Sequence, residues 1–309
     1  MIISIVTATY NRCELLQVLY RSLLAQEYTA LEWIIVDDGG SDNTPAVVDA
    51  MQREAAFPIR YMHQKNGGKQ EAINQGLDLV TGDLVCVVDD DDYFLPRVLS
   101  TVAKDYETIA ANQEIAGLSY LTVDADNHVW GKSFPHDRMV SDHYQCRINQ
   151  RVWGDKLEFT KAAILKSHAI RYPFVKRPGG FGGDTVFFLF IANHGKTLYI
   201  NFPVLVKEYR CDGLSVNWRR KALENPSLTA SYYAAHLDKR VRLLIRLRYM
   251  VAYAAILAYA PDVVSDAPVR EPGNRLLYAM ACLPGKLLAM RWKKYSRAGM
   301  PLSSQWLKH

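Results

Sequence analysis

Leu84-Val85-Cys86-Val87-Val88-Asp89-Asp90-Asp91-Asp92 is the stretch that decides the fold, because a short apolar run ends there in four consecutive aspartates. A run of this length, rich in valine and bounded by charge, predicts a buried strand. Two earlier apolar runs also end in polar residues: residues 2–8 are followed by Thr9-Tyr10-Asn11, and residues 31–36 by Asp37-Asp38. Strands that end in polar residues indicate a sheet with a functional carboxyl edge.

Helical periodicity fills the gaps between these strands. We expect helices over residues 12–25, 44–53 and 68–80, and a further short strand over residues 59–63. Apolar strands that alternate with helices predict an α/β fold, Rossmann-like, with a mostly parallel sheet flanked by helices. In such sheets ligands bind outside the carboxyl ends of the strands, so the polar strand ends are expected to form one site.

The chain organisation follows from changes in this pattern along the 309 residues. Regular alternation covers residues 1–100, whereas residues 101–217 mix short apolar runs with aromatic and glycine-rich loops and are expected to complete the same domain. Residues 218–309 are predicted to form a basic helical C-terminal region. Hydrophobic residues make up 49% and charged residues 22% of the chain, which is typical of a globular protein and excludes extensive disorder.

The five cysteines are far apart and form no CxxC pair, so neither a zinc knuckle nor a disulfide framework is expected. A reducing cytosol fits this cysteine usage best. The N-terminus lacks a basic segment and turns polar after eight residues, so we interpret it as a first strand and not as a signal peptide.

Charge is unevenly distributed. Residues 206–309 contain 18 Lys and Arg against 7 Asp and Glu, a net charge of +11, whereas the whole chain carries +5. Residues 1–205 therefore carry −6, and this part is expected to handle a cation. The basic tail is expected to face an anionic partner.

The aspartate run Asp89–Asp92 predicts a metal site. Adjacent carboxylates repel one another, and a bound cation removes this cost. Strand alternation places Asp89 and Asp91 on one side, where they can share one ion. Oxygen ligands suit Mg²⁺ or Mn²⁺ better than zinc. The alternative is a solvated acidic loop.

Three further segments leave a structural and a functional interpretation open. Residues 37–44 form either a turn with a helix cap or a site where Asp38 accepts hydrogen bonds from a base or ribose. Residues 66–69 place two glycines and Lys69 before a helix, which can make an anion site but is not a P-loop. Asp184 opens an apolar helix, either as a cap favoured by the helix dipole or as a general base.

Together these motifs resemble the family 2 glycosyltransferases, which have the GT-A fold. The matching segments are Ala8-Thr9-Tyr10-Asn11-Arg12, residues 37–44, the series Asn66/Gly68/Ala72/Asn74/Gly76, Asp89–Asp92 with Pro96, Gly183-Asp184 and Tyr209/Arg210/Gly213/Ser215. In three places the chain departs from the family pattern: Ala8 replaces a frequent proline, Gly40 a serine and Gly183 a glutamate. The resemblance covers about residues 1–215 and does not reach the residues after 218.

The resemblance implies an enzyme, an inverting glycosyltransferase that moves a sugar from a nucleotide-diphosphate sugar, usually a UDP-sugar, to a hydroxyl of a glycan or lipid-linked acceptor. Residues 1–100 would bind the donor and residues 101–217 the acceptor. Asp91 would ligate Mn²⁺ or Mg²⁺, and Asp184 would deprotonate the acceptor hydroxyl.

The resemblance also implies a set of binding residues. Thr9 and Asp38 would contact the base, and Asp89 would lie near the ribose. The full set of expected donor contacts is Thr9, Tyr10, Asn11, Arg12, Asp38, Gly68, Lys69, Asp89 and Asp90. Arg210 and Ser215 are candidates for diphosphate or acceptor contacts.

Two other functions compete with sugar transfer. A sugar nucleotidyltransferase would share the sheet and the metal, but it normally needs a glycine-rich loop where this chain has Thr9-Tyr10-Asn11-Arg12. A non-catalytic binding or assembly protein with a degenerate transferase fold would account for Gly40 and Gly183, but the intact aspartates argue against it.

The basic tail has two interpretations. Residues 240–249 and 275–297 combine Arg and Lys with Leu, so they can lie on an anionic membrane, which would place a cytoplasmic protein at the inner face of the membrane. Alternatively, they form a helical subdomain that packs on the catalytic domain or on a second subunit, as in a homo-oligomer. A nucleic-acid partner is not expected, because no recognised binding motif accompanies the charge.

Overall fold

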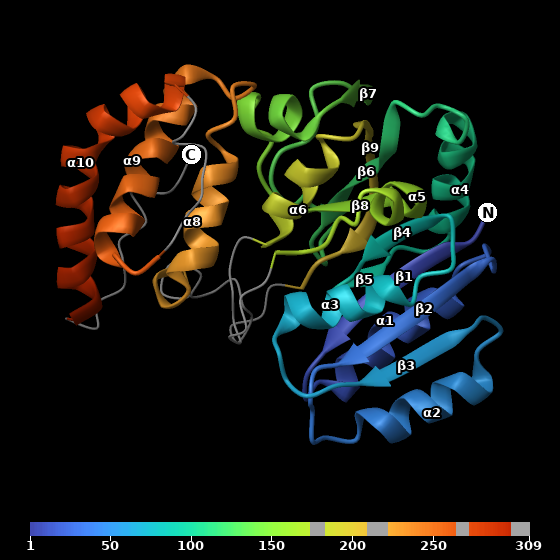
Figure 1. Ribbon diagram of the computed structural model, residues 1–309. Coiled ribbons are helices and arrows are strands. Elements are labelled where there is room, and N and C mark those ends of the chain that lie inside the picture. Colours follow the sequence, from blue (N-terminus) through green and yellow to red (C-terminus); the bar gives the residue numbers. More distant parts are fainter. Residues whose placement is uncertain (174–182, 209–221, 264–271, 298–309) are drawn as a thin grey trace.

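The fold is described by a computed structural model, which places residues 1–173, 183–208, 222–263 and 272–297. Figure 1 shows a sheet flanked by helices, with a separate group of helices at one end of the molecule. Arg210, Ser215 and the expected domain boundary at residue 217 lie outside the described residues.

One sheet forms the body of the described part of residues 1–208. Its strands lie in the order β3-β2-β1-β4-β8-β6-β9-β5, and β7 pairs with β9. The strands are β1 (Ile3–Thr9), β2 (Leu31–Asp37), β3 (Ile59–His63), β4 (Leu84–Val87), β5 (Tyr93–Phe94), β6 (Ile115–Val123), β7 (Arg138–Ser141), β8 (Lys156–Lys161) and β9 (Lys196–Val206).

The first half of the sheet is parallel, as the sequence predicts. β1 pairs in parallel with β2 and β4, and β2 pairs in parallel with β3. The register sets Thr9 opposite Asp37 and Val6 opposite Val87, so three strand ends lie side by side. The second half adds antiparallel pairing, because β8 runs antiparallel to both β4 and β6. The α/β fold class is therefore confirmed, and the sheet as a whole is mixed.

Helices cover both faces of the sheet. One face packs against α1 (Cys13–Leu24), α2 (Thr44–Glu54) and α4 (Val98–Ile109), and the other against α3 (Lys69–Asp78), α5 (Ala162–Ser167) and α6 (Gly183–Ile191). The side chains of β1 alternate accordingly: Ile3 and Ile5 point to the first face, and Val6 points to the second. Burial on both faces explains why these strands are continuous apolar runs.

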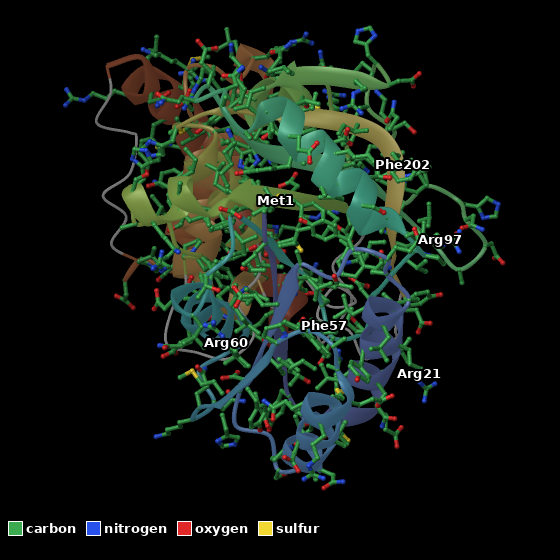
Figure 2. The ribbon with its side chains drawn as sticks, turned by 90° about the vertical axis from the view of Figure 1, so that its right-hand side faces the viewer. Met1, Arg21, Phe57, Arg60, Arg97 and Phe202 are labelled. Carbon is green, nitrogen blue, oxygen red and sulfur yellow. The ribbon has the colours of Figure 1, made fainter. Side chains whose placement is uncertain are left out.

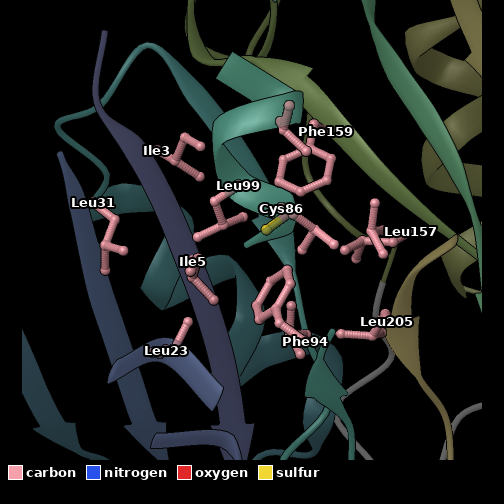
Figure 3. Close-up of a cluster of buried hydrophobic side chains, with 14 of the residues drawn as sticks. Ile3, Ile5, Leu23, Leu31, Cys86, Phe94, Leu99, Leu157, Phe159 and Leu205 are labelled. Carbon is pink, nitrogen blue, oxygen red and sulfur yellow. The ribbon is translucent and has the colours of Figure 1, made fainter. Parts of the chain in front are cut away.

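The core on the first face fixes the strands that carry the polar ends. Figure 3 shows Ile5 of β1, Cys86 of β4, Leu99 of α4 and Phe159 of β8 in one cluster of buried side chains. Burying a side chain of this size contributes about 1.5–3 kcal/mol, so the cluster holds β1 and β4 firmly in register.

The helices on this face are amphipathic. In the view of Figure 2, Arg21 of α1 and Arg97, which precedes α4, lie at the periphery with exposed side chains. Phe57, between α2 and β3, is buried and packs in the same core cluster as Leu16 and Leu19 of α1.

The C-terminal region is helical, as predicted. It consists of α8 (Pro226–Ala235), α9 (Leu243–Tyr259) and α10 (Pro272–Arg297). These helices bury a cluster of their own that includes Tyr253, Ala281 and Trp292. The packing interpretation of the basic tail therefore holds for the inward face of these helices. Among the described residues, no helix combines the length and the apolar character needed to cross a bilayer.

Hydrogen bonds and a cation–π contact connect this helical region to the sheet domain. The π-helix η1 (Tyr144–Asn149) ends at Asn149, whose Nδ2 donates to the carbonyl of Arg240 at 2.8 Å. The amide of Arg242 donates to Oδ1 of Asn149 at 2.9 Å. The guanidinium of Arg240 also lies over the ring of Tyr144, 3.9 Å from its centre.

Candidate functional site

The carboxyl ends of β1, β2 and β4 meet at one edge of the sheet. The amide of Asp38 donates to the carbonyl of Thr9 at 2.9 Å, and the amide of Val88 donates to the carbonyl of Val6 at 3.0 Å. These bonds extend the parallel pairing to the last residues of each strand. The predicted convergence of the polar strand ends is therefore observed.

The four aspartates form a turn. β4 ends at Val87, and the amide of Asp92 donates to the carbonyl of Asp89 at 3.2 Å. Strand alternation is therefore the wrong reason for bringing Asp89 and Asp91 together, because the strand has already ended. The turn instead gathers three carboxylates: ligand atoms of Asp89, Asp91 and Asp92 lie within 4.8 Å of one another.

Two lysines flank this carboxylate cluster. Nζ of Lys69 lies 2.6 Å from Oδ1 of Asp89, and Nζ of Lys207 lies 2.8 Å from Oδ2 of Asp92 and 3.6 Å from Oδ2 of Asp89. Desolvation acts to raise the pKa of Asp89, but the two lysine charges outweigh it and hold that pKa below its ordinary value. Desolvation raises the pKa of Asp92, and Lys207 opposes this shift only in part.

Asp90 points back to β1, away from this group of three. Its Oδ2 accepts a hydrogen bond from Oγ1 of Thr9 at 2.8 Å, and its Oδ1 lies 3.3 Å from Nη1 of Arg12. The same Arg12 nitrogen lies 3.3 Å from Oδ2 of Asp91. Burial raises the pKa of Asp90 to about 6, and the contacts with Thr9 and Arg12 counteract part of that rise. Thr9 and Arg12 thus tie β1 to the aspartate turn.

The cluster fits a divalent cation. Oδ1 of Asp92 is buried, and among the residues that the structure describes no hydrogen-bond donor reaches it. A buried carboxylate oxygen without a donor is costly unless a cation satisfies it. Three carboxylates that offer only oxygen ligands match the preference of Mg²⁺ or Mn²⁺.

Asp38 holds the loop that precedes α3. Its Oδ1 accepts hydrogen bonds from the amide of Gly67 and from Nε2 of Gln64, and its Oδ2 accepts one from the amide of Gly68, all at 2.8 Å. Gly68 has a φ of +96°, which favours glycine. Lys69 follows as the first residue of α3 and reaches Asp89. Asp38 therefore positions the glycines, and its contact with a base stays a prediction.

The segment after β1 is tied to the loop after β2. Asn11 has a φ of +53°, and its Oδ1 accepts hydrogen bonds from the amide of Ser41 at 2.7 Å and of Asp42 at 3.2 Å. The side chain of the preceding Tyr10 is left 50% exposed at the same edge. Tyr10 is thus available to a ligand, whereas Asn11 shapes the backbone beside it.

Asp184 lies in the first turn of α6, where the helix dipole favours a negative charge. The side chain is exposed to solvent, yet the surrounding protein raises the pKa of its carboxyl by desolvation, an effect that the charge of Lys69 opposes. The charges of Asp89 and Lys207 also act on this pKa, so Asp184 belongs to the same electrostatic environment as the aspartate turn. An accessible carboxylate of raised pKa suits a general base.

One residue of this site, Lys207, was not predicted from the sequence, and Asp92 was predicted only as a member of the aspartate run. Asp92 belongs to the quoted run, and its burial opposite Lys207 sets it apart from its neighbours. Lys207 immediately follows β9, beside the segment that begins at Tyr209. Only this proximity in sequence could have indicated it, because its partners lie far away along the chain.

Comparison with known sequences gives consistent matches. A family model described as glycosyl transferase family 2 matches residues 4–162. The glycosyltransferase GlyG of Streptococcus pneumoniae is 32% identical over 165 residues, which cover 53% of this chain and 54% of GlyG. A Campylobacter jejuni GalNAc(5)-diNAcBac-PP-undecaprenol beta-1,3-glucosyltransferase is 35% identical over 105 residues, 32% of this chain and 33% of that protein. The matches thus span between a third and about half of these relatives.

Solved structures share the fold over nearly the whole chain. S. aureus TarS (residues 1–349) in complex with UDP-GlcNAc superimposes with a TM-score of 0.61 at 16% identity and covers 97% of this chain and 93% of that one. The mannosyltransferase PcManGT from Pyrobaculum calidifontis, in complex with GDP-Man and Mn²⁺, gives a TM-score of 0.56 at 17% identity, covering 94% and 87%. At sequence identities this low, the comparison shows that the fold is shared and nothing more.

Proposed function

Because this chain belongs to glycosyl transferase family 2, we propose that it transfers a sugar from a nucleotide-diphosphate sugar to an acceptor hydroxyl. The observation that carries the proposal is the carboxylate cluster of Asp89, Asp91 and Asp92 at the carboxyl edge of the sheet. Ligands of open α/β sheets bind at this edge. A divalent cation bound by the carboxylate cluster would offset the negative charge of a diphosphate.

The donor in this proposal is a UDP-sugar. The likeness in fold to TarS, which was solved with UDP-GlcNAc, supports a nucleotide-sugar donor, and PcManGT with GDP-Man keeps guanine as the alternative base. Thr9, Tyr10 and Asp38 lie at the ends of β1 and β2, where a base and a ribose would bind. Lys69, the first residue of α3, would face the diphosphate, whereas the amides of Gly67 and Gly68 donate to Asp38 and shape the loop before it.

Asp91 would ligate the divalent metal, and the geometry adds Asp89 and Asp92 as candidate ligands. When bound, the metal neutralises charge on the leaving diphosphate. The protein contributes Lys69 and Lys207, whose ammonium groups lie against two of these carboxylates and orient them.

Asp184 is the proposed general base of an inverting transfer. It would accept the proton of the acceptor hydroxyl while the hydroxyl oxygen attacks the anomeric carbon and the nucleoside diphosphate leaves from the opposite face. Its raised pKa and its exposure support this role. Gly183 stands where the family pattern has a glutamate, so Asp184 would act without an acidic neighbour.

The acceptor is proposed to be a glycan or a lipid-linked glycan in the cytoplasm. The Campylobacter relative is named for an undecaprenol-linked substrate, and a Sodalis glossinidius relative, 35% identical over 115 residues, is an undecaprenyl-phosphate 4-deoxy-4-formamido-L-arabinose transferase. Both names include a polyprenyl group, which supports a polyprenyl-linked acceptor.

Asp184→Asn tests most directly whether Asp184 is the general base of the transfer. The amide keeps the size of the side chain but cannot accept the proton, so we expect transfer to fall at least about 100-fold while UDP binding stays within about two-fold. Asp126→Asn, on an exposed loop, is the matched control and should transfer normally. Normal turnover by Asp184→Asn would remove Asp184 from the mechanism. UDP binding without transfer in the wild-type chain would favour the non-catalytic alternative.

A further inference from the structure

The outer face of α10 carries a stripe of exposed apolar side chains. Its members are Leu276 (67% exposed), Met280 (61%), Leu283 (69%), Leu287 (56%) and Met290 (60%). Their spacing alternates between four and three residues, which places them on a single face within an arc of about 80°. We name this set the α10 stripe.

Packing among the residues that the structure describes does not account for the stripe. The opposite face of α10 supplies the buried residues Leu277, Ala281, Ala289 and Trp292, which pack in the cluster shared with α9. Gly285 lets the two helices approach closely, because a Cβ atom at this position would lie 2.7 Å from Cβ of Ala254. Figure 1 shows α10 as the outermost helix, on the far side of α9 from the sheet. The stripe therefore faces away from the body of the protein.

More apolar surface lies at the start of the same helix pair. Nη2 of Arg246 in α9 donates to Oδ1 of Asn274 in α10 at 2.6 Å, which brings the first turns of the two helices together. Leu243 and Leu244, which open α9, are 57% and 81% exposed. An apolar surface of this extent on a globular protein marks an interaction site.

The charges of α10 identify the kind of partner. The helix sequence contains no Asp or Glu. Five of its basic side chains are exposed, namely Arg275, Lys286, Arg291, Lys293 and Lys294. A helix that combines an exposed apolar stripe with basic neighbours and no acidic residue is complementary to an anionic, apolar surface.

We propose that the α10 stripe docks onto an anionic lipid surface, with α10 lying in the plane of the membrane. The leucines and methionines would enter the boundary between head groups and acyl chains, and the flanking lysines and arginines would contact anionic head groups. This surface is separate from the donor site, and the inference does not depend on sugar transfer. It gives the basic tail a role that goes beyond the proposed reaction.

Self-association of the stripe is the main alternative, because alternating spacings of four and three also form the seam of a coiled coil. In a coiled coil, acidic and basic residues flank the seam and pair across it. Here the exposed flanking charges of α10 are all basic, so two copies would bring like charges together. Charge complementarity therefore favours lipid over a second copy of the chain.

Vesicle flotation tests the proposal directly. We expect the wild-type chain to float with phosphatidylglycerol-containing vesicles at low salt, and to bind pure phosphatidylcholine vesicles at least about ten-fold more weakly. Combined Met280→Ser, Leu283→Ser and Leu287→Ser should lower partitioning at least about ten-fold. Because these side chains are exposed, the variant should keep its thermal stability and its affinity for UDP. No flotation of the wild-type chain would overturn the proposal.

The matched control changes three exposed apolar residues elsewhere: Val18→Ser, Val140→Ser and Phe202→Ser, which are 43%, 50% and 37% exposed. This variant should float like the wild-type chain, and equal losses in both triple variants would contradict the assignment to α10. Lys286→Glu with Lys294→Glu should weaken binding to anionic vesicles at least about ten-fold and leave the weak binding to neutral vesicles unchanged.

Light scattering in the absence of lipid decides between the two partners. The proposal predicts that the wild-type chain and the stripe variant have the same mass in solution. A wild-type dimer that the stripe substitutions convert to a monomer would assign the stripe to self-association and overturn the lipid proposal.

Discussion

At the scale of single residues, the carboxylates at the carboxyl edge of the sheet have different partners and hence different roles. Asp38 accepts three hydrogen bonds from the loop before α3, whereas Oδ1 of Asp92 receives none from the described residues. A carboxylate whose two oxygens both accept hydrogen bonds from the protein is a structural anchor, and one with a free buried oxygen is suited to a cation. The two aspartates are therefore expected to respond differently to substitution.

Asp38→Ala should destabilise the protein by about 2 kcal/mol, because it leaves the buried amide of Gly68 and the partly buried amide of Gly67 without an acceptor. Chemical denaturation without metal measures this loss. Asp49→Ala is the matched control: Asp49 is exposed on α2 and forms an exposed ion pair with Arg53, so its loss should cost less than about 0.5 kcal/mol. Equal stability of the two variants would show that Asp38 does not hold the loop.

The sequence predicts which residues form this site better than it predicts their contacts. Thr9, Asp90 and Lys69 were expected at one edge, and they lie there because parallel strands end side by side. The pairing of Lys207 with Asp92 could not be predicted, since it depends on β9 returning to the edge of the sheet after more than a hundred residues. The grouping of Asp89 with Asp91 was predicted, but for the wrong reason, because β4 ends at Val87 and a turn brings these side chains together with Asp92.

At the scale of elements, the amphipathic pattern predicts helices more reliably than it predicts which face is covered. Residues 240–249 were expected to be helical, and α9 (Leu243–Tyr259) extends ten residues beyond this segment because the apolar residues that follow contain no helix breaker. The sequence of α10 shows apolar residues on several faces. Only the packing of α9 against one of them reveals that the α10 stripe remains exposed.

A buried histidine links the first two helices of this region. His236, just after α8, is 2% exposed, its ring stacks on Tyr249 of α9 at 3.9 Å between ring centres, and its Nδ1 lies 2.8 Å from the carbonyl of Tyr232. Desolvation lowers the pKa of His236 to about 4. In the unfolded chain His236 has the ordinary histidine pKa of about 6.5. At a pH between about 4 and 6.5, His236 is therefore protonated in the unfolded chain and neutral in the folded one.

His236 should accordingly make stability depend on pH. Its contribution is complete above the ordinary histidine pKa of about 6.5 and is lost as the pH falls toward 4, by about 2 kcal/mol between pH 7 and pH 5. His236→Phe keeps a ring on Tyr249 without a titrating group, so its unfolding free energy should fall less over the same range. Parallel slopes for the two proteins, measured by denaturation at each pH, would exclude His236 as the source.

At the scale of the whole molecule, the two charged regions have separate locations. The acidic carboxyl edge lies on the sheet, whereas the basic helices form a group of their own, joined to the sheet half through Asn149 and Arg240. The α/β class, the parallel first half and the helical C-terminal region were predictable from periodicity. The antiparallel insertion of β8 between β4 and β6 was not, because it pairs segments that are distant in sequence.

The central claim is that the aspartate turn binds a nucleotide-sugar donor together with a divalent metal. Calorimetric titration of UDP into the protein, with Mn²⁺ and then with EDTA, tests it most directly, with Asp126→Ala as a control in a second acidic cluster. We predict binding that needs Mn²⁺, persists in Asp126→Ala and weakens at least about ten-fold in Asp91→Ala. Equal UDP affinity with Mn²⁺ and with EDTA, unchanged in Asp91→Ala, would contradict the metal-dependent site.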